Sequence, residues 1–333
     1  MTSLSFDQLQ ALLNGPRPYQ LAGLDLSKAR LNEVDLSGAD LSLSNLSGAD
    51  LSKAYLSRAN LRGANLTGAK LHGATLTGAD LREATFRKAF LIKANLSGAD
   101  LEGSVLTEAL LIGAKLTGVK LAGANLTGAD LSGANLFEAD LSGACLNSAV
   151  LISTDLSGAD MSGVQLNNAI LSGAQLNEAH LDQAHLRCAD LSGAKLNGAS
   201  LVAADLTEAD LFEALLIGAK LADARLSCAR LVDADLSGAD LSGADLSGAR
   251  LSHACLISTE LSSANMRGAA LDGTTLYGAQ FGNADLSDAN LTEADLNGAR
   301  LSKSFLQKAN LNEADLSHVI LTGTIMPDGT QHS

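Results

Sequence analysis

Histidine and cysteine are the residues of this 333-residue chain whose types and spacing could do metal or thiol chemistry. Two near pairs stand out, His253 with Cys255 and His185 with Cys188. A protein metal site generally needs three or four converging ligands, and neither pair has an evident third member. The spacings of the full cysteine set match no zinc or redox motif; the set is Cys145, Cys188, Cys228 and Cys255. We therefore predict isolated cysteines, with no metal and no cofactor.

Other catalytic arrangements are equally hard to find. The chain has 32 glycines, but none forms a phosphate-binding loop that follows a strand and opens a helix. No convergent set of acid, base and nucleophile is evident either. The sequence therefore predicts a protein that is not an enzyme.

Charge and hydropathy narrow the class further. The net charge of -14 disfavours direct binding to nucleic acid or to anionic lipid. No stretch of about 18 apolar residues is present, so no membrane-spanning segment is expected. Residues 1–20 lack the pattern of a signal peptide. We expect a cytoplasmic protein.

The elements that must position any site follow from one repeat. From Leu21 to Met326, every residue whose number ends in 1 or 6 is apolar, and 57 of these 62 central positions are Leu. Of the 61 positions two residues earlier, from 24 to 324, 49 are Ala. A period of five fits neither a helix nor an ordinary strand. The repeat therefore predicts a solenoid.

Each repeat has its own local structure. The central Leu and the Ala two residues before it alternate with polar neighbours, as they would in a short extended segment with both apolar residues facing inward. The Gly two residues after the centre, as at Gly38, Gly48 and Gly98, suits a turn residue with positive φ. Geometry alone leaves open how many five-residue sides form one coil.

The number of sides is implied by a resemblance, which three short segments carry. Ala39-Asp40-Leu41-Ser42, Ala124-Asn125-Leu126-Thr127-Gly128 and Ala239-Asp240-Leu241-Ser242-Gly243 resemble the repeats of pentapeptide-repeat proteins. The resemblance covers residues 21–326 and implies an all-β fold, a right-handed four-sided parallel β-helix with 20 residues per coil. It then implies about 15.5 coils, and a rod roughly 75 Å long at the ~4.8 Å separation of paired strands.

Both ends of the repeat region need covers. Residues 1–20 are predicted to form an N-terminal cap, because Ser5 and Gln8 have capping-box spacing and Asn14-Gly15-Pro16 is a stop signal. A short helix over about 6–13 would carry the apolar stripe of Phe6, Leu9, Leu12 and Leu13. The 327–333 tail is too short for a helix. The last coil is therefore expected to offer an open edge near Ile320 and Ile325, where end-to-end pairing is possible.

A 20-residue coil lets the surface be sorted into four sides, because residues that differ by 20 stack on one side. The sides that contain Leu21, Leu26, Leu31 and Leu36 carry net charges of -5, -1, -4 and -4. No side is a strongly acidic wall. Some members of the family are thought to mimic DNA and engage gyrase. Duplex DNA of this length would carry ~44 charges, about three times the net charge here. An acidic DNA mimic acting on a type II topoisomerase such as gyrase is the alternative function.

Outward apolar residues carry the leading prediction. They gather on the side that contains Leu31 and, farther along, on the adjacent side. Strand preference of β-branched and aromatic residues also explains such residues. Their clustering, however, favours an interface. The candidate partner surface comprises Phe90, Ile92, Leu110, Ile112, Val150, Ile152, Ile170, Phe212, Leu215, Ile217 and Val232.

The predicted function is a non-enzymatic scaffold or protein–protein interaction rod with an unidentified protein partner. End-to-end or side-to-side homo-oligomers are possible. Columns of aspartates, such as Asp80 with Asp100 and Asp140 with Asp160, would place carboxylates one coil apart, where repulsion shifts a pKa. Without a cleft, these columns are interpreted as solvated decoration of the repeat.

Overall fold

A computed structural model describes residues 6–333 of the chain. It divides into two compact units, unit 1 up to Gln165 and unit 2 from Leu166 to Ser333. Each unit is described by itself. The division of the chain into an N-terminal cap, a repeat region and a tail stays a proposal.

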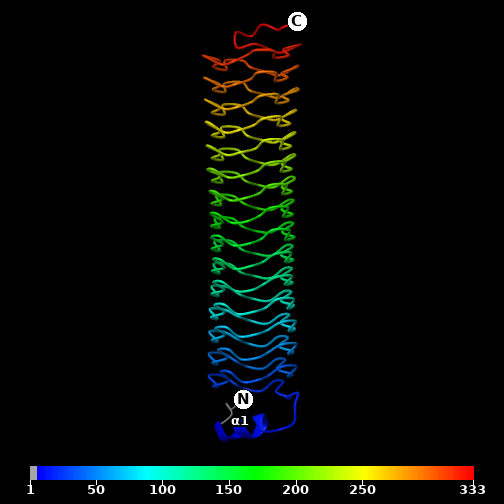
Figure 1. The fold of residues 1–333 in the computed structure, drawn as a ribbon, viewed down its shortest axis with the longest axis vertical. Coiled ribbons are helices and arrows are strands. Elements are labelled where there is room, and N and C mark those ends of the chain that lie inside the picture. Colours follow the sequence, from blue (N-terminus) through cyan, green and yellow to red (C-terminus); the bar gives the residue numbers. More distant parts are fainter. Residues whose placement is uncertain (1–5) are drawn as a thin grey trace. The chain divides into compact units, whose positions relative to one another are not determined.

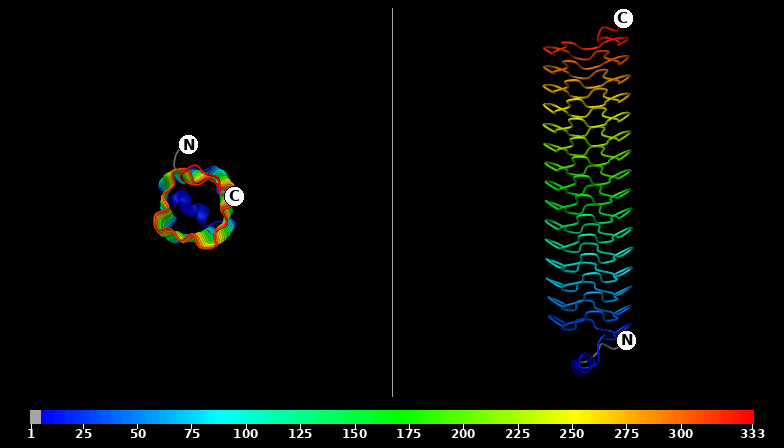
Figure 2. Two further views of the ribbon diagram at one scale, coloured as in Figure 1. Left: turned by 90° about the horizontal axis from the view of Figure 1, so that it is seen from above. Right: turned by 45° about the vertical axis from the view of Figure 1, so that its right-hand side comes forward.

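Unit 1 is a right-handed, four-sided parallel β-helix. The residue before each central Leu forms a parallel bridge with the residue 20 positions later, from Gln20 with Asp40 to Cys145 with Gln165. Three backbone hydrogen bonds join a typical side to the next coil, and one of them runs from the Leu26 amide to the Asn45 carbonyl at 2.7 Å. Figures 1 and 2 show these stacked coils. The predicted 20-residue period is therefore present as isolated bridges rather than as long strands.

Unit 2 repeats the same construction. Its parallel bridges run from Ile170 with Asp190 to Phe305 with Ile325, again with a step of 20 residues. The amide of Leu226 donates to the carbonyl of Asp245 at 2.6 Å, and the amide of Asp245 donates to the carbonyl of Ala224 at 2.9 Å. A side that lies between two other coils therefore satisfies backbone groups through both of them.

The interior of each unit consists of leucine and alanine ladders. Leu126 in unit 1 and Leu226 in unit 2 are fully buried, as are the alanines Ala124 and Ala224. Larger central residues are accommodated too, because Phe86 is also fully buried. The predicted inward direction of both apolar positions is confirmed. The coil interior is thus filled by side chains.

A few buried hydroxyls replace alanine at the inner corners. The Thr154 hydroxyl donates to the carbonyl oxygen of Leu131 at 2.8 Å, and the Ser44 hydroxyl donates to that of Leu41 at 2.6 Å. The hydroxyl of Ser104 is buried without a partner in the described part of the chain. The corners at Thr154 and Ser44 therefore accept a small polar group because a backbone carbonyl is within reach.

The turns have the predicted left-handed backbone. Gly38 has φ 66° and Gly98 has φ 64°. Non-glycine residues adopt the same conformation at this position, including Lys53 at φ 55° and Glu108 at φ 56°. The coil-to-coil hydrogen bonds impose the turn on every side, so the sequence tolerates side chains where glycine is conformationally easier.

A short helix, α1, spans Phe6–Leu13. Figure 2 shows it across the N-terminal end of unit 1. It ends where the amide of Gly15 donates to the carbonyl of Leu12 at 3.1 Å, just before Pro16. The predicted capping residue Ser5 lies outside the described residues, as do the side chains of three members of the predicted apolar stripe, Phe6, Leu9 and Leu13.

The C-terminal residues cover one side of the predicted open edge, at Ile325, whereas Ile320 stays 41% exposed. Residues 327–332 fold back on the last coil, and Ile325 forms an antiparallel bridge with Gln331. The amide of Met326 donates to Thr330, and the amide of Gly323 donates to His332, at 2.7 and 2.8 Å. The tail is too short for a helix, but it is long enough to pair with the backbone of one side of the last coil.

Candidate interaction surfaces

The predicted apolar surface begins in unit 1 with two consecutive coils. Phe90 and Leu110 are bridge partners on the side that contains Leu31, here called the Leu31 side. Ile92 and Ile112 occupy the corresponding positions just after the central leucines. Phe90 and Ile112 are each 37% exposed, whereas Ile92 and Leu110 are half-buried. These four side chains are therefore neighbours on one surface of unit 1.

The next coil interrupts this surface. Asp130 is bridged to Leu110 on one side and to Val150 on the other. The hydroxyl and amide of Ser132 donate to the Asp130 carboxylate at 2.6 and 2.9 Å. Beyond it, Val150 is half-buried and Ile152 is 41% exposed. A polar coil therefore separates Val150 and Ile152 from the first four residues.

In unit 2 the predicted residues are more dispersed. Ile170 is exposed but is bridged to Asp190, so no apolar neighbour follows it. The guanidinium of Arg230 lies 4.2 Å from the centre of the Phe212 ring and donates to the Asp210 carboxylate at 3.0 and 3.1 Å. Phe212 is consequently covered by its own chain.

The other unit 2 residues form smaller exposures. Val232 and Leu215 are half-buried, and Leu215 lies between the charged bridge partners Lys195 and Asp235. Ile217 is 45% exposed. Phe212 and Val232 lie in consecutive coils, but both are half-buried, so unit 2 presents less apolar surface in such a pair than unit 1 does.

Sorting by side missed several exposed residues. Leu43 is 74% exposed at a turn position, and Tyr55 is 54% exposed. Neither has an apolar neighbour in its column, since Tyr55 is bridged to Asp35 and Thr75. Both residues could be predicted as exposed from their outward positions alone, whether or not other apolar residues lie nearby.

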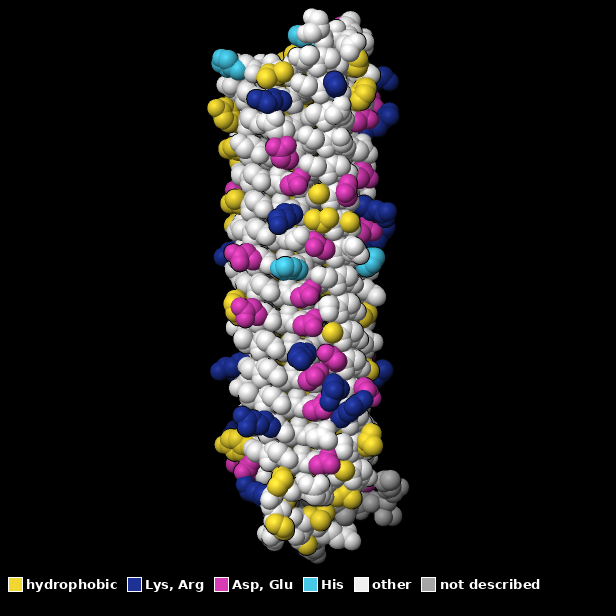
Figure 3. All heavy atoms as spheres, turned by 90° about the vertical axis from the view of Figure 1, so that its right-hand side faces the viewer, with side chains coloured by type: hydrophobic (Ala, Val, Ile, Leu, Met, Phe, Trp, Pro, Cys, Tyr) yellow, Lys and Arg dark blue, Asp and Glu magenta, His cyan; other side chains and the backbone are white. Residues whose placement is uncertain are grey.

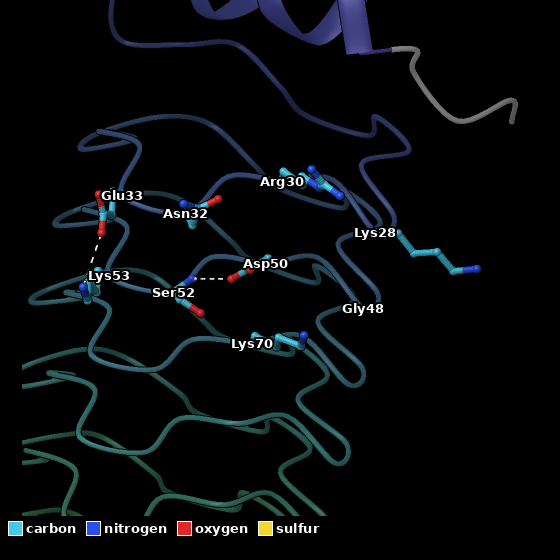
Figure 4. Close-up of a pocket in the computed structure, with 9 residues that line it drawn as sticks. All are labelled: Lys28, Arg30, Asn32, Glu33, Gly48, Asp50, Ser52, Lys53 and Lys70. Carbon is cyan, nitrogen blue, oxygen red and sulfur yellow. Dashed lines mark hydrogen bonds and ion pairs between the residues drawn. The ribbon is translucent and has the colours of Figure 1, made fainter.

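An open hollow of about 620 Å³ lies on the same Leu31 side, closer to the N-terminal end of unit 1 than the apolar residues are. Its central column alternates in charge, with Arg30 bridged to Asp50 and Asp50 bridged to Lys70 (Figure 4). Hydrogen bonds from Ser52, followed by the attraction of Lys70 and His72, lower the pKa of Asp50. At the corners are Lys28 and a Lys53–Glu33 ion pair of 3.3 Å. The hollow is therefore polar and has a basic excess.

Charge is also unevenly distributed along the chain, which the net charges of the four sides do not reveal. Residues 51–98 contain eight Lys or Arg and only two Asp or Glu, although the whole chain has a net charge of -14. A count in windows along the repeat, rather than by side, gives this signal. On the face drawn in Figure 3, acidic and basic side chains are interspersed on a largely uncharged surface.

The aspartate columns have a structural explanation. Asp80 and Asp100 are bridge partners, as predicted. However, Arg82 donates two hydrogen bonds to Asp80, at 2.8 and 2.6 Å, and lies 3.8 Å from Asp100. The hydrogen bonds from Arg82 lower the pKa of Asp80, the reverse of the effect expected from repulsion. The Asp140 carboxylate instead accepts hydrogen bonds from the amide and the hydroxyl of Ser142, at 3.0 and 2.7 Å.

The same serine arrangement recurs along the repeat. In many Asp-Leu-Ser strings the carboxylate accepts the amide two residues later, as in Asp190 with Ser192 at 2.9 Å. Such a bond fixes the turn after the central leucine. The frequent aspartates therefore serve the fold.

The histidine–cysteine pairs do not assemble a centre. All four cysteines are free thiols. Within residues 6–333, no three His, Cys, Asp or Glu side chains come together in a way that could hold a metal ion. The thiol of Cys188 contacts the Glu208 carboxylate at 3.6 Å. Of the helices in the described residues, none has the length and apolar character needed to cross a bilayer.

Comparison with known proteins defines the class. The pentapeptide-repeat family matches eight times between residues 25 and 326, over residues 25–68, 64–103, 94–133, 134–173, 174–211, 214–252, 254–292 and 289–326. The chain belongs to the pentapeptide-repeat family. No curated protein matches it significantly.

Several solved structures are similar. HetL, a pentapeptide repeat protein involved in heterocyst differentiation regulation from the cyanobacterium Nostoc, is 35% identical over 68% of this chain and 91% of its own, with a TM-score of 0.33. A protein of the Arabidopsis thaliana thylakoid lumen is 38% identical over 30% of this chain and 66% of its own, with a TM-score of 0.25. QnrB1, a plasmid-mediated fluoroquinolone resistance protein, is 18% identical over 56% of this chain and 86% of its own, with a TM-score of 0.29.

Proposed function

We propose that this protein is a non-enzymatic scaffold that binds a protein partner through the Leu31 side of unit 1. The observation that carries the proposal is the pair of consecutive apolar coils, Phe90 with Ile92 and Leu110 with Ile112, on an otherwise polar surface. Apolar side chains that gather on a surface are typical of an interface. Val150 and Ile152, beyond the polar coil of Asp130, would extend the contact.

The interior supports a binding role rather than catalysis. Leucine and alanine side chains fill each unit, so a partner must bind from outside. The hollow at Arg30 and a second one of about 330 Å³, lined by Leu12 and Tyr19 among others, are open to solvent. Neither brings together a nucleophile, a base and an oxyanion site. The outer surface of the coils is therefore the part of the molecule available for recognition.

Unit 2 would contribute less to the same function. Arg230 covers Phe212, which leaves Ile217 as the most exposed aliphatic side chain of the proposed set in this unit. We include Ile170, Leu215 and Val232 in the proposal as secondary contacts, because each retains some exposed surface.

The test is crosslinking in the native cell, followed by affinity purification of the tagged full chain. A double variant, Ile112→Asp with Ile152→Asp, places charges on the proposed surface. Leu43→Asp is the matched control, because Leu43 is an exposed aliphatic side chain on another side of unit 1. We expect one or more partners to be lost from the double variant and retained by the control. Partners that are recovered equally with all three proteins would refute the proposal.

A gyrase-directed DNA mimic is the second candidate, and the charge of unit 2 favours it. Residues 166–333 contain 21 acidic and 10 basic residues. We expect a mimic to inhibit DNA supercoiling by purified gyrase or to protect gyrase from a quinolone. The absence of both effects at a large molar excess would eliminate this candidate.

Oligomeric state and location complete the proposal. We propose a cytoplasmic protein whose Leu31 side binds a protein partner or a second copy of the chain. Sedimentation of the purified chain measures its oligomeric state, and fractionation of the source cell measures its location. A chain recovered only from another compartment would contradict the proposed location.

A further inference from the structure

The basic residues of unit 1 are concentrated on three adjacent sides. On the sides that contain Leu26, Leu31 and Leu36, residues 45–98 include six basic residues and one acidic residue, Asp50. Outside residues 51–98, unit 1 holds five basic and fourteen acidic residues, and Asp50 is one of the fourteen. The six basic residues are Lys53, Arg58, Lys70, Arg87, Lys88 and Lys93. They form a basic band within an acidic unit.

Most of the band has no ion-pair partner. Lys53 pairs with Glu33, and Lys88 pairs with Glu108, each at 3.3 Å between exposed side chains. Exposed pairs of this kind contribute little free energy and exchange readily. The other four basic residues form no ion pair within the part of the chain that the structure describes, and the same is true of Lys28 and Arg30 beside the hollow. The positive charge is therefore available to a ligand.

The basic band and the apolar residues meet without a gap on the Leu31 side. Lys70 is bridged to Phe90, and Phe90 is bridged to Leu110. The His72 ring stacks on the Phe90 ring, with centres 6.1 Å apart and planes inclined by 16°. From Arg30 to Leu110 the column crosses four coil spacings, roughly 19 Å. The column, here called the strip, thus changes from a charged part with a basic excess, in which Asp50 lies between Arg30 and Lys70, to an apolar part.

We propose that this strip binds an acidic segment of a partner protein whose carboxylates precede large apolar side chains. The carboxylates would contact Arg30 and Lys70 at the hollow, and the apolar side chains would contact Phe90 and Ile112. An extended segment of about six residues covers this distance at ~3.3 Å per residue. The inference rests on the proposed function and names the chemistry of the partner.

Charge complementarity favours a short segment over an extended polyanion. A DNA duplex or a bilayer surface would also face the remainder of unit 1, which has a net charge of -9. Repulsion there opposes the attraction of the band. A six-residue segment fits within the strip and avoids that repulsion. The adjoining apolar residues also match a protein segment better than a phosphate backbone.

The experiment measures fluorescence anisotropy with the full chain and a fluorescein-labelled peptide, Asp-Glu-Asp-Glu-Phe-Leu-Ile. Two control peptides carry Lys in place of the four acids, or Ser in place of the three apolar residues. We expect saturable binding of the first peptide only, weakened when salt rises from about 50 to 200 mM because the Debye length shortens.

Two variants locate the site. Lys70→Glu should weaken binding about tenfold or more, because it reverses the central charge of the strip. Lys195→Glu is the matched control, since Lys195 is also an exposed bridge residue and lies between the uncharged residues Gln175 and Leu215 of unit 2. If Lys70→Glu unfolds the chain, as judged by its thermal transition, Lys93→Gln takes its place. Lys93 is exposed at a turn and has no ion pair.

Three results would overturn the inference. They are no saturable binding of the acidic peptide, equal binding by the Lys70 and Lys195 variants, and Lys70-dependent binding to phosphatidylserine vesicles or a DNA duplex without binding to the peptide. The cellular experiment separates this inference from the proposed function. A partner that depends on Ile112 but not on Lys70 leaves the proposed function standing and refutes the acidic segment.

Discussion

Substitution of Leu126 by alanine removes one member of a leucine ladder in unit 1. The leucines one coil below and one coil above, Leu106 and Leu146, are fully buried, as is Leu126 itself. Their backbones are fixed by the coil-to-coil bonds, since the amide of Leu106 donates to Asn125 and that of Leu126 donates to Cys145, both at 2.7 Å. The substitution therefore leaves a cavity whose walls have little freedom to collapse.

The expected loss of stability follows from that rigidity. Buried Leu→Ala substitutions cost about 2.7–5 kcal/mol, and the cost rises when the surrounding structure does not relax. We predict a loss of about 4 kcal/mol for Leu126→Ala. Leu126→Met is the control, with an expected loss below about 1.5 kcal/mol because its volume is similar. Methionine already occupies the centre at Met161 and Met266, where it is fully buried.

The assay is urea unfolding followed by circular dichroism. Amide hydrogen exchange near Asn125 and Cys145 accompanies it, because repeat proteins can unfold in parts. We expect a lower midpoint and faster exchange in the coils around residue 126. A loss below about 1 kcal/mol with an unchanged m-value would show that the coils collapse onto the cavity. That result would refute the inference that the coil-to-coil hydrogen bonds keep the surrounding residues from moving into the cavity.

Two further predictions concern buried hydroxyls and carboxylates. Ser104→Ala should leave stability unchanged or raise it by about 1 kcal/mol, because the buried Ser104 hydroxyl has no partner within the described residues. Ser44→Ala should lower stability by about 1 kcal/mol, because it removes a 2.6 Å hydrogen bond. Urea midpoints measure both effects, and a larger loss for Ser104→Ala than for Ser44→Ala would contradict this difference between the two hydroxyls. The pKa of Asp80 is lowered by Arg82, so its contribution to stability is present above the unfolded pKa of about 3.9 and is lost as pH falls through the lower folded pKa. Asp80→Asn should therefore flatten the dependence of the urea midpoint on acid pH, and a slope identical to that of the natural chain would refute the role of this carboxylate.

The period of five residues was sufficient to predict the interior. Every central leucine must face the same way for the coil to close, so Leu126 and Ala124 could be placed inside from their numbers alone. Turn chemistry was equally local, because Gly38 and Gly98 mark positions with positive φ. The number of sides in a coil came from family resemblance, since a five-residue side does not determine how many sides close.

Side-chain interactions across coils were not predictable in the same way. Phe212 reads as exposed from its outward position, but the flexible Arg230 side chain covers it. Asp80 and Asp100 read as a repulsive pair, whereas Arg82 reaches both carboxylates. The net charge of a whole side does not indicate the basic band, because each side combines the basic residues of 51–98 with acidic residues elsewhere along the chain.

The most direct test of the account is photocrosslinking in the native cell from residue 112. A photoreactive amino acid replaces Ile112 in one chain and Leu43 in a second, because these exposed aliphatic residues lie on different sides of unit 1. We predict a crosslinked protein partner at residue 112 that is absent at residue 43 and is reduced by Lys70→Glu. Identical crosslinks from both positions would contradict an interface on the Leu31 side.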